Sequence, residues 1–292
     1  MANPEFLLRV AVLCGIVVLI SYIYWRVSKR LLGLVRLKCR NILLVPVSGL
    51  LGVATMFLLF SVWVYHGFGY QPDIYRLGDR TSNKVAITFD DGPSEEFTLP
   101  ILDILRELDA PATFFMVGKH VEKYPHVAQR VVEEGHTVGN HTQSHRNLPT
   151  LSTIELQKEV MESTAIITEV TGVYPVFVRP PRGMYDDRFR RLAKLLGQEI
   201  VLWSISTRDW RYGVTPTYIE RFVDSRVRGG DIILFHDSGA LVKSEGGDRK
   251  ATVLSLANVI EIIRAKGLEI VPLDELLHGA PPEAFPQVDR PE

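Results

Sequence analysis

Short, uninterrupted apolar segments alternate with segments of helical periodicity from residue 84 onward, and this alternation constrains the fold more than any other feature. A short continuous apolar run is typical of a strand buried on both faces, as in parallel sheets. Strands that alternate with helices form a parallel sheet, and about seven such units suit an α/β barrel. A doubly wound open sheet is the alternative. The predicted strands are 85–89, 112–117, 136–140, 176–179, 200–205, 231–236 and 268–272, and the predicted helices are 97–108, 124–134, 152–170, 187–196, one that begins at Thr215-Pro216, and 250–265.

Two stretches without charged residues, 10–25 and 41–65, precede this region. A helix needs about 20 predominantly apolar residues to cross a bilayer, so we predict transmembrane helices over about 7–25 and 41–65. The segment between them, 26–40, holds six Lys and Arg residues and no acidic residue, and such loops stay in the cytoplasm. Residues 1–66 are therefore predicted to form a multi-pass anchor in the lipid bilayer of the cell membrane, with the rest of the chain facing outside.

Each predicted span has an alternative interpretation. Residues 10–25 could form a cleaved signal peptide, but no small-x-small cleavage site follows and the flanking charge is heavier on the C-terminal side. Residues 41–65 could form a soluble core helix, but their length and apolar character argue against it.

The outer part of the chain divides into three segments: a linker at 67–83, the α/β domain at 84–277, and a proline-rich tail at 278–292 that we expect to be disordered. Both cysteines, Cys14 and Cys39, precede the linker, so the outer domain is predicted to fold without a disulfide. A net charge of -1 gives no indication of a nucleic-acid partner.

Polar and ionisable residues recur where the predicted strands end. In parallel α/β folds the carboxyl ends of the strands meet at one rim, where chemistry gathers. These residues are Asp90 and Asp91 after the first strand, Asn140, His141 and His145 after the third, Arg179 after the fourth, Asp209 and Trp210 after the fifth, and His236 in the sixth.

The spacing of His141 and His145 suits a metal site. Residues four apart share one face of a helix, so both imidazoles would point the same way if 141–145 were helical. With one carboxylate of the Asp90-Asp91 pair they would make three N/O ligands and leave room for water, which is typical of catalytic zinc. The second carboxylate would then be free to act as a base. The simpler alternative is a turn, because Asp-Gly is common turn chemistry.

The chain resembles the polysaccharide deacetylase family, that is, the NodB-homology enzymes of carbohydrate esterase family 4. The resemblance covers about 84–277 and consists of five motifs in order: TFDDGP at 88–93, HTQSH at 141–145, RPPRG at 179–183, DW at 209–210 and LFH at 234–236. It implies a distorted (β/α)7 barrel and a divalent metal, usually Zn2+, although cobalt, nickel and manganese also suit such a site.

The resemblance also implies roles for individual residues. Asp91, His141 and His145 would hold the metal, and Asp90 would be the general base. His236 would be the general acid and Asp209 its partner. Arg179 would orient Asp90. The backbone N–H of Arg182 would stabilise the oxyanion, and Leu234 and Trp210 would line a pocket for the acetyl methyl group.

Two positions depart from the family pattern. The third motif usually has Tyr where this chain has Arg182, whose side chain could reshape the sugar site or contact an anionic glycan. The fourth motif often carries an Asp three residues before its final Asp, and here that position is Ser206. The second departure affects the network around the acid and leaves the metal ligands intact.

The sequence thus predicts a membrane-anchored N-deacetylase of an acetylated cell-surface glycan, such as peptidoglycan or another N-acetylglucosamine polymer. Three alternatives remain: removal of a formyl or acetyl group from a lipid-linked sugar, hydrolysis of O-acetyl esters, and a non-catalytic glycan-binding scaffold.

Overall fold

The computed structural model describes residues 4–31, 50–55, 57, 71, 73–239 and 247–279. Helix α1 (Pro4–Leu31) covers the predicted span 7–25 and continues into the basic segment. Among the residues that the structure describes, no helix combines the length and the apolar character that crossing a membrane requires. Most of the second predicted span, 41–65, and residues 32–40 of the basic segment lie outside the described residues.

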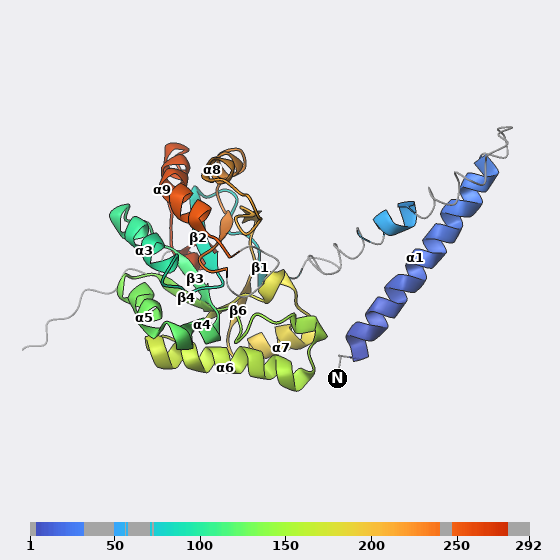
Figure 1. The fold of residues 1–292 in the computed structure, drawn as a ribbon, viewed down its shortest axis with the longest axis horizontal. Coiled ribbons are helices and arrows are strands. Elements are labelled where there is room, and N and C mark those ends of the chain that lie inside the picture. The colour runs from blue at the N-terminus through green and yellow to red at the C-terminus, as the bar shows by residue number, and fades with distance from the viewer. Residues whose placement is uncertain are drawn as a thin grey trace, which may run out of the picture. The chain divides into compact units, whose positions relative to one another are not determined.

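The α/β domain is built on a parallel sheet of nine short strands, surrounded by helices (Figure 1). The strand order is β1-β6-β5-β4-β3-β2-β8-β7, and β9 also pairs with β2. The strands are β1 (Ile74–Tyr75), β2 (Lys84–Asp90), β3 (Thr113–Met116), β4 (Thr137–Asn140), β5 (Phe177–Val178), β6 (Glu199–Val201), β7 (Ile205–Ser206), β8 (Ile232–His236) and β9 (Glu269–Ile270). The main helices are α3 (Thr98–Glu107), α4 (Gly118–Lys123), α5 (Pro125–Glu133), α6 (Thr153–Thr171), α7 (Asp187–Leu195), α8 (Pro216–Asp224), α9 (Lys250–Ala265) and α10 (Leu273–His278).

One predicted strand, 200–205, is two strands in the structure. β6 pairs with β5 and β1 near one edge of the sheet, whereas β7 pairs with β8 at the other edge. Leu202 N–H donates to Tyr75 O at 2.7 Å and Ser204 N–H donates to Ile232 O at 3.1 Å, so residues 202–204 cross from one edge to the other. Three residues span roughly 10 Å, which forces the two edges together. The sheet is therefore a curved, parallel half-barrel of the (β/α)7 type.

The side chains of β2 alternate between two faces: one packs into the outer hydrophobic core, and the other points toward the interior of the half-barrel. Ile87 and Phe89 belong to the large cluster that packs against the helices, whereas Ala86 belongs to a smaller cluster with Phe115. Because side chains alternate along a strand, Thr88 and Asp90 share the interior face of Ala86. The interior of β2 thus becomes more polar toward its carboxyl end.

Both boundaries of the α/β domain differ from the predicted ones. Residues 74–75, predicted to lie in the linker, form β1, and Gly78 N–H donates to Gly230 O at 2.8 Å. A two-residue strand is too short to produce a periodic sequence pattern. At the other flank α10 ends at His278, and residues 280–292 of the predicted tail lie outside the described residues.

Candidate active site

The two adjacent carboxylates of Asp90 and Asp91 occupy the same site because the strand ends between them. Successive side chains of an extended strand point to opposite faces. Asp91 instead has a left-handed backbone with φ of 78°, which turns the chain. Both residues are buried, at 3% and 5% exposure. The carbonyl oxygen of Asp91 accepts a hydrogen bond of 2.6 Å from Nδ1 of His120 on α4, which holds this turn in place.

Asp90 is held by Arg179, which is fully buried. Nη1 of Arg179 donates to Oδ1 of Asp90 at 2.6 Å and to Thr88 Oγ1 at 2.9 Å. Nε and Nη2 donate to the carbonyl oxygens of Val201 and Leu202 at the end of β6. A buried charge needs a partner and filled hydrogen-bonding sites, and this arrangement supplies both. Asp90 is thereby held in one orientation beside the guanidinium of Arg179.

His141 and His145 come together through an irregular loop; residues 141–145 are not helical, so the shared helix face that we considered for the two imidazoles does not occur. Thr142 and His145 have positive φ angles of 69° and 54°. Oδ1 of Asn140 accepts from Thr142 N–H at 2.7 Å. On α6, buried Glu159 accepts from the N–H and the hydroxyl of Ser144. These side-chain hydrogen bonds replace the helical ones and fix the loop.

Asp91, His141 and His145 form a cluster whose candidate ligand atoms all lie within 4.8 Å of one another. Oδ1 of Asp91 lies 3.5 Å from Nε2 of His141 and 3.3 Å from Nε2 of His145. Nδ1 of His141 donates to Arg179 O at 2.8 Å, which leaves Nε2 as the ring nitrogen that can bind a cation. Oδ1 of Asp91 is buried without a hydrogen-bond partner among the described residues. One divalent cation would satisfy all three groups, so these residues fit a metal.

Protonation states also suit a metal. Burial opposes ionisation of Asp91, yet the neighbouring imidazoles hold its pKa well below its usual range. Burial lowers the pKa of His145 to about 3. A carboxylate and a neutral imidazole are the forms that bind a cation, because metal ligands must be deprotonated.

The final residue of β8, His236, forms a pair with Asp209. Oδ1 of Asp209 lies 2.8 Å from Nδ1 of His236, and Oδ2 accepts from the His236 N–H at 2.7 Å. Thr252 on α9 donates its hydroxyl to the same Oδ2 at 2.8 Å. Burial opposes the charged imidazole, but the carboxylate of Asp209 raises the pKa of His236 to about 9. His236 therefore holds a proton at neutral pH.

The remaining predicted site residues lie on the same rim. Leu234 is buried and precedes His236 by two positions on β8, so both side chains share the interior face. Arg182 lies in a short 3-10 turn, Pro181–Gly183, with φ of 57°. Trp210 follows Asp209 and is half-buried, and Ser206, the departure in the fourth motif, ends β7.

Three residues near the site escaped the sequence analysis: His120, Glu159 and Thr252. Only Glu159 left a recognisable signal. It lies among Leu156, Val160 and Ile167 on the buried face of α6, where a charged residue is unusual. The other two act through backbone geometry and hydroxyl contacts that no spacing predicts.

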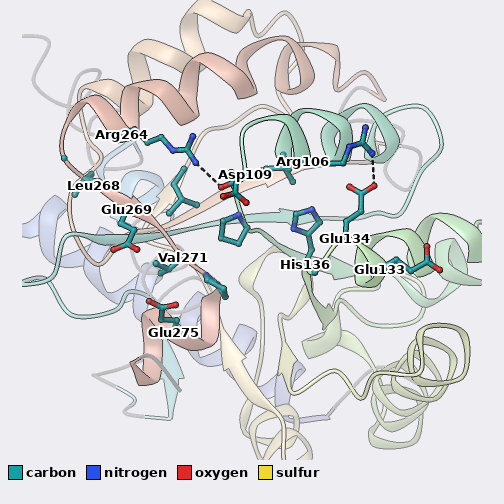
Figure 2. Close-up of a pocket in the computed structure, with 17 residues that line it drawn as sticks. Arg106, Asp109, Glu133, Glu134, His136, Arg264, Leu268, Glu269, Val271 and Glu275 are labelled. Atoms are coloured by element: carbon teal, nitrogen blue, oxygen red, sulfur yellow. Dashed lines mark hydrogen bonds and ion pairs between the residues drawn. The ribbon is translucent and has the colours of Figure 1, made fainter. Parts of the chain in front are cut away.

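A large hollow of about 1030 Å³ lies away from this site (Figure 2). Most of its lining residues precede β3, β4 or β9, and the others lie in or directly after β9, so it faces the amino ends of β3 and β4. His136 lies within it, and both ring nitrogens of His136 are buried without a hydrogen-bond partner among the described residues. This hollow contains none of the predicted site residues.

Comparison with known proteins settles the family. The Polysaccharide deacetylase family profile matches residues 78–201. A peptidoglycan-N-acetylglucosamine deacetylase of Bacillus cereus is 35% identical over 199 residues, which is 68% of this chain and 70% of that protein. The chain belongs to the polysaccharide deacetylase family. It is therefore a hydrolase of non-peptide carbon–nitrogen bonds.

Two solved structures share the fold of this deacetylase domain. The Bc1960 peptidoglycan N-acetylglucosamine deacetylase has a TM-score of 0.66 at 33% identity, over 71% of this chain and 94% of that chain. BA3943 of Bacillus anthracis, described as a CE4 family pseudoenzyme, has a TM-score of 0.65 at 25% identity, over 72% and 70% of the two chains. The same fold thus occurs with and without activity, so the site residues must carry the functional argument.

Proposed function

We propose that this deacetylase hydrolyses acetamide groups of an N-acetylglucosamine-containing cell-surface glycan, of which peptidoglycan is the leading candidate. One observation carries the proposal: the Asp91, His141 and His145 cluster lies against the side chain of Asp90, which Arg179 holds in place by a hydrogen bond. Asp90 Oδ2 is 3.7 Å from Nε2 of His141, so a base stands beside the metal ligands. The named activity of the Bacillus cereus relative supports the choice of glycan.

In this proposal Asp90 and His236 each carry out one of the two proton transfers. Bound Zn2+ at the cluster would polarise the acetamide carbonyl and acidify the attacking water. Asp90 takes a proton from that water as its oxygen bonds to the carbonyl carbon. His236, held protonated by Asp209, gives a proton to the nitrogen as the carbon–nitrogen bond breaks. The products are acetate and a free amine.

Other residues position the substrate in this proposal. The backbone N–H of Arg182 stabilises the oxyanion, as a preorganised donor in a partly dry site. Leu234 and Trp210 contact the acetyl methyl group.

We also infer that residues 1–66 anchor the enzyme in the cell membrane with the catalytic domain outside. The uncharged segments 10–25 and 41–65 and the basic segment 26–40 support this inference. Protease added to intact protoplasts should cleave residues beyond about 70. Protection of that region until the membrane is lysed would contradict the outward orientation.

Acetate release tests the catalytic proposal. Purified full-length protein is incubated with N-acetylglucosamine oligomers and with peptidoglycan fragments, with zinc or with chelator. We expect acetate that depends on the metal. If no glycan releases acetate, lipid-linked acetylated or formylated sugars are tested next, and failure there as well would favour the non-catalytic scaffold.

A further inference from the structure

A second hollow, of about 720 Å³, lies on α8 and holds three arginines. We call it the α8 groove. Its main side chains are Arg208, Arg221, Arg226, Tyr218, Phe222 and Ser225. Its described lining residues include no carboxylate, although the whole chain has a net charge of -1. Gathering like charges in one hollow is unfavourable unless an anion offsets them.

The acidic residues of α8 are engaged elsewhere. Glu220 accepts a hydrogen bond of 2.9 Å from Asn258 on α9, and Asp224 lies 2.9 Å from Nζ of Lys266. Within the described part of the chain, Arg208 and Arg221 form no ion pair. The groove therefore keeps its positive charge, and its guanidinium groups remain available to a ligand.

The guanidinium group of Arg226 is held in place by neighbouring side chains of the α8 groove. Its guanidinium lies over the ring of Phe222, 4.0 Å from the centroid, and Nη1 donates to Ser225 Oγ at 2.8 Å. A stacked guanidinium is restrained and still presents N–H donors at its edge. Arginine binds carboxylates and phosphates with two parallel hydrogen bonds, which lysine cannot do.

Arg208 joins the α8 groove to the active-site rim. It immediately precedes Asp209, and its backbone is left-handed with φ of 57°. Asp209 is buried against His236, whereas Arg208 is exposed and lines the groove. Nearby Tyr212 is 99% exposed and Tyr218 is 39% exposed, and such rings provide flat surfaces on which a sugar can stack.

We propose that the α8 groove binds an anionic group, a carboxylate or a phosphate, carried by the same glycan that the neighbouring active site deacetylates. This inference rests on the proposed function and narrows its substrate to an acidic glycan. Peptidoglycan fragments that retain their peptide carboxylates fit this class. Neutral N-acetylglucosamine oligomers reach the active site without the additional contact.

The ratio of two rates tests the groove. Acetate release is measured with full-length protein on carboxylate-bearing peptidoglycan fragments and on neutral N-acetylglucosamine oligomers with the same number of sugars. In the double variant Arg221→Ala, Arg226→Ala we expect the kcat/KM ratio of charged to neutral substrate to fall about three- to tenfold. Added salt should lower the same ratio in the unmodified protein. Arg191→Ala, which removes an exposed arginine from α7, is the matched control and should leave the ratio unchanged.

Further experiments identify the chemical class of the bound anion and test whether a membrane lipid is its source. A phosphate-bearing glycan replaces the carboxylate-bearing one to show which anion the groove accepts. An unchanged ratio in the double variant overturns the proposal. So does a double variant that loses binding to vesicles containing anionic phospholipid while its kcat/KM ratio stays unchanged, because the groove would then be a membrane contact.

Failure of the proposed function gives a different result. If neither substrate releases acetate, binding of the charged and neutral fragments is measured directly by calorimetry. Weaker binding of the charged fragment to the double variant than to the unmodified protein would support the groove without catalysis. Equal binding would overturn it.

Discussion

In the proposed reaction Asp90 has two functions: it accepts a hydrogen bond from Arg179 and it takes a proton from water. A conservative substitution removes the second function and keeps the first. Asp90→Asn keeps the size of the side chain and an oxygen for Nη1 of Arg179, but it cannot accept a proton from water. We expect kcat for acetate release to fall about 10²- to 10⁴-fold, the usual contribution of a general base. Zinc content of the purified variant should stay unchanged, because Asp90 is not a proposed ligand. Full activity in this variant would remove Asp90 from its role as base.

His236 must hold a proton to serve as the acid, so its pKa sets the alkaline limb of the pH profile. Activity should fall as pH rises through that pKa. In Asp209→Asn the carboxylate that raises the pKa of His236 is gone, and burial, which lowers the pKa, prevails. We expect the alkaline limb of kcat/KM to move to lower pH. If the alkaline limb lies at the same pH in both proteins, ionisation of His236 does not determine it.

At the scale of elements, α6 holds the loop that carries two of the proposed metal ligands. Glu159→Gln removes the charged acceptor for the N–H and hydroxyl of Ser144. Mutation of residues that support metal ligands typically lowers metal affinity by about 10- to 100-fold. We expect Glu159→Gln to lower zinc affinity by a factor in this range. Competition with a chromophoric chelator measures it.

Glu162→Gln on the same helix is the control, since Glu162 pairs at 3.6 Å only with Lys158 of its own helix among the described residues. Its zinc affinity should match that of the unmodified protein. Equal losses in both variants would point to a general effect on α6, and no loss in either would remove Glu159 from its supporting role.

The strands were predictable because parallel strands buried on both faces read as continuous apolar runs. The same rule merged β6 with β7, since the crossing residues Leu202 and Trp203 are themselves apolar. The grouping of polar residues at one rim also followed from the sequence. The loop at 141–145 did not, because its left-handed residues, such as Thr142, are fixed by side-chain hydrogen bonds from Asn140 and from Glu159 on α6, which no local pattern predicts.

At the scale of the whole molecule, buried ionisable groups are concentrated at the carboxyl ends of the strands. The outer core is aliphatic and aromatic, whereas Asp91, Arg179 and Asp209 are almost completely buried at the rim. Burying charges costs stability unless each is paired. Asp91 has no hydrogen-bond partner for Oδ1 among the described residues, so this rim is where bound metal should stabilise the fold most.

Thermal unfolding of the full-length chain tests that link. A ligand that binds only the folded state adds about 2.7 kcal/mol when present at 100 times its Kd. In a domain of about 200 residues each kcal/mol raises Tm by roughly 2–4 °C, so we expect zinc to raise Tm by about 5–10 °C over chelator. Asp91→Ala should abolish the increase, because the remaining histidines lack the carboxylate that completes the cluster. An equal increase in this variant would place the stabilising metal elsewhere in the chain.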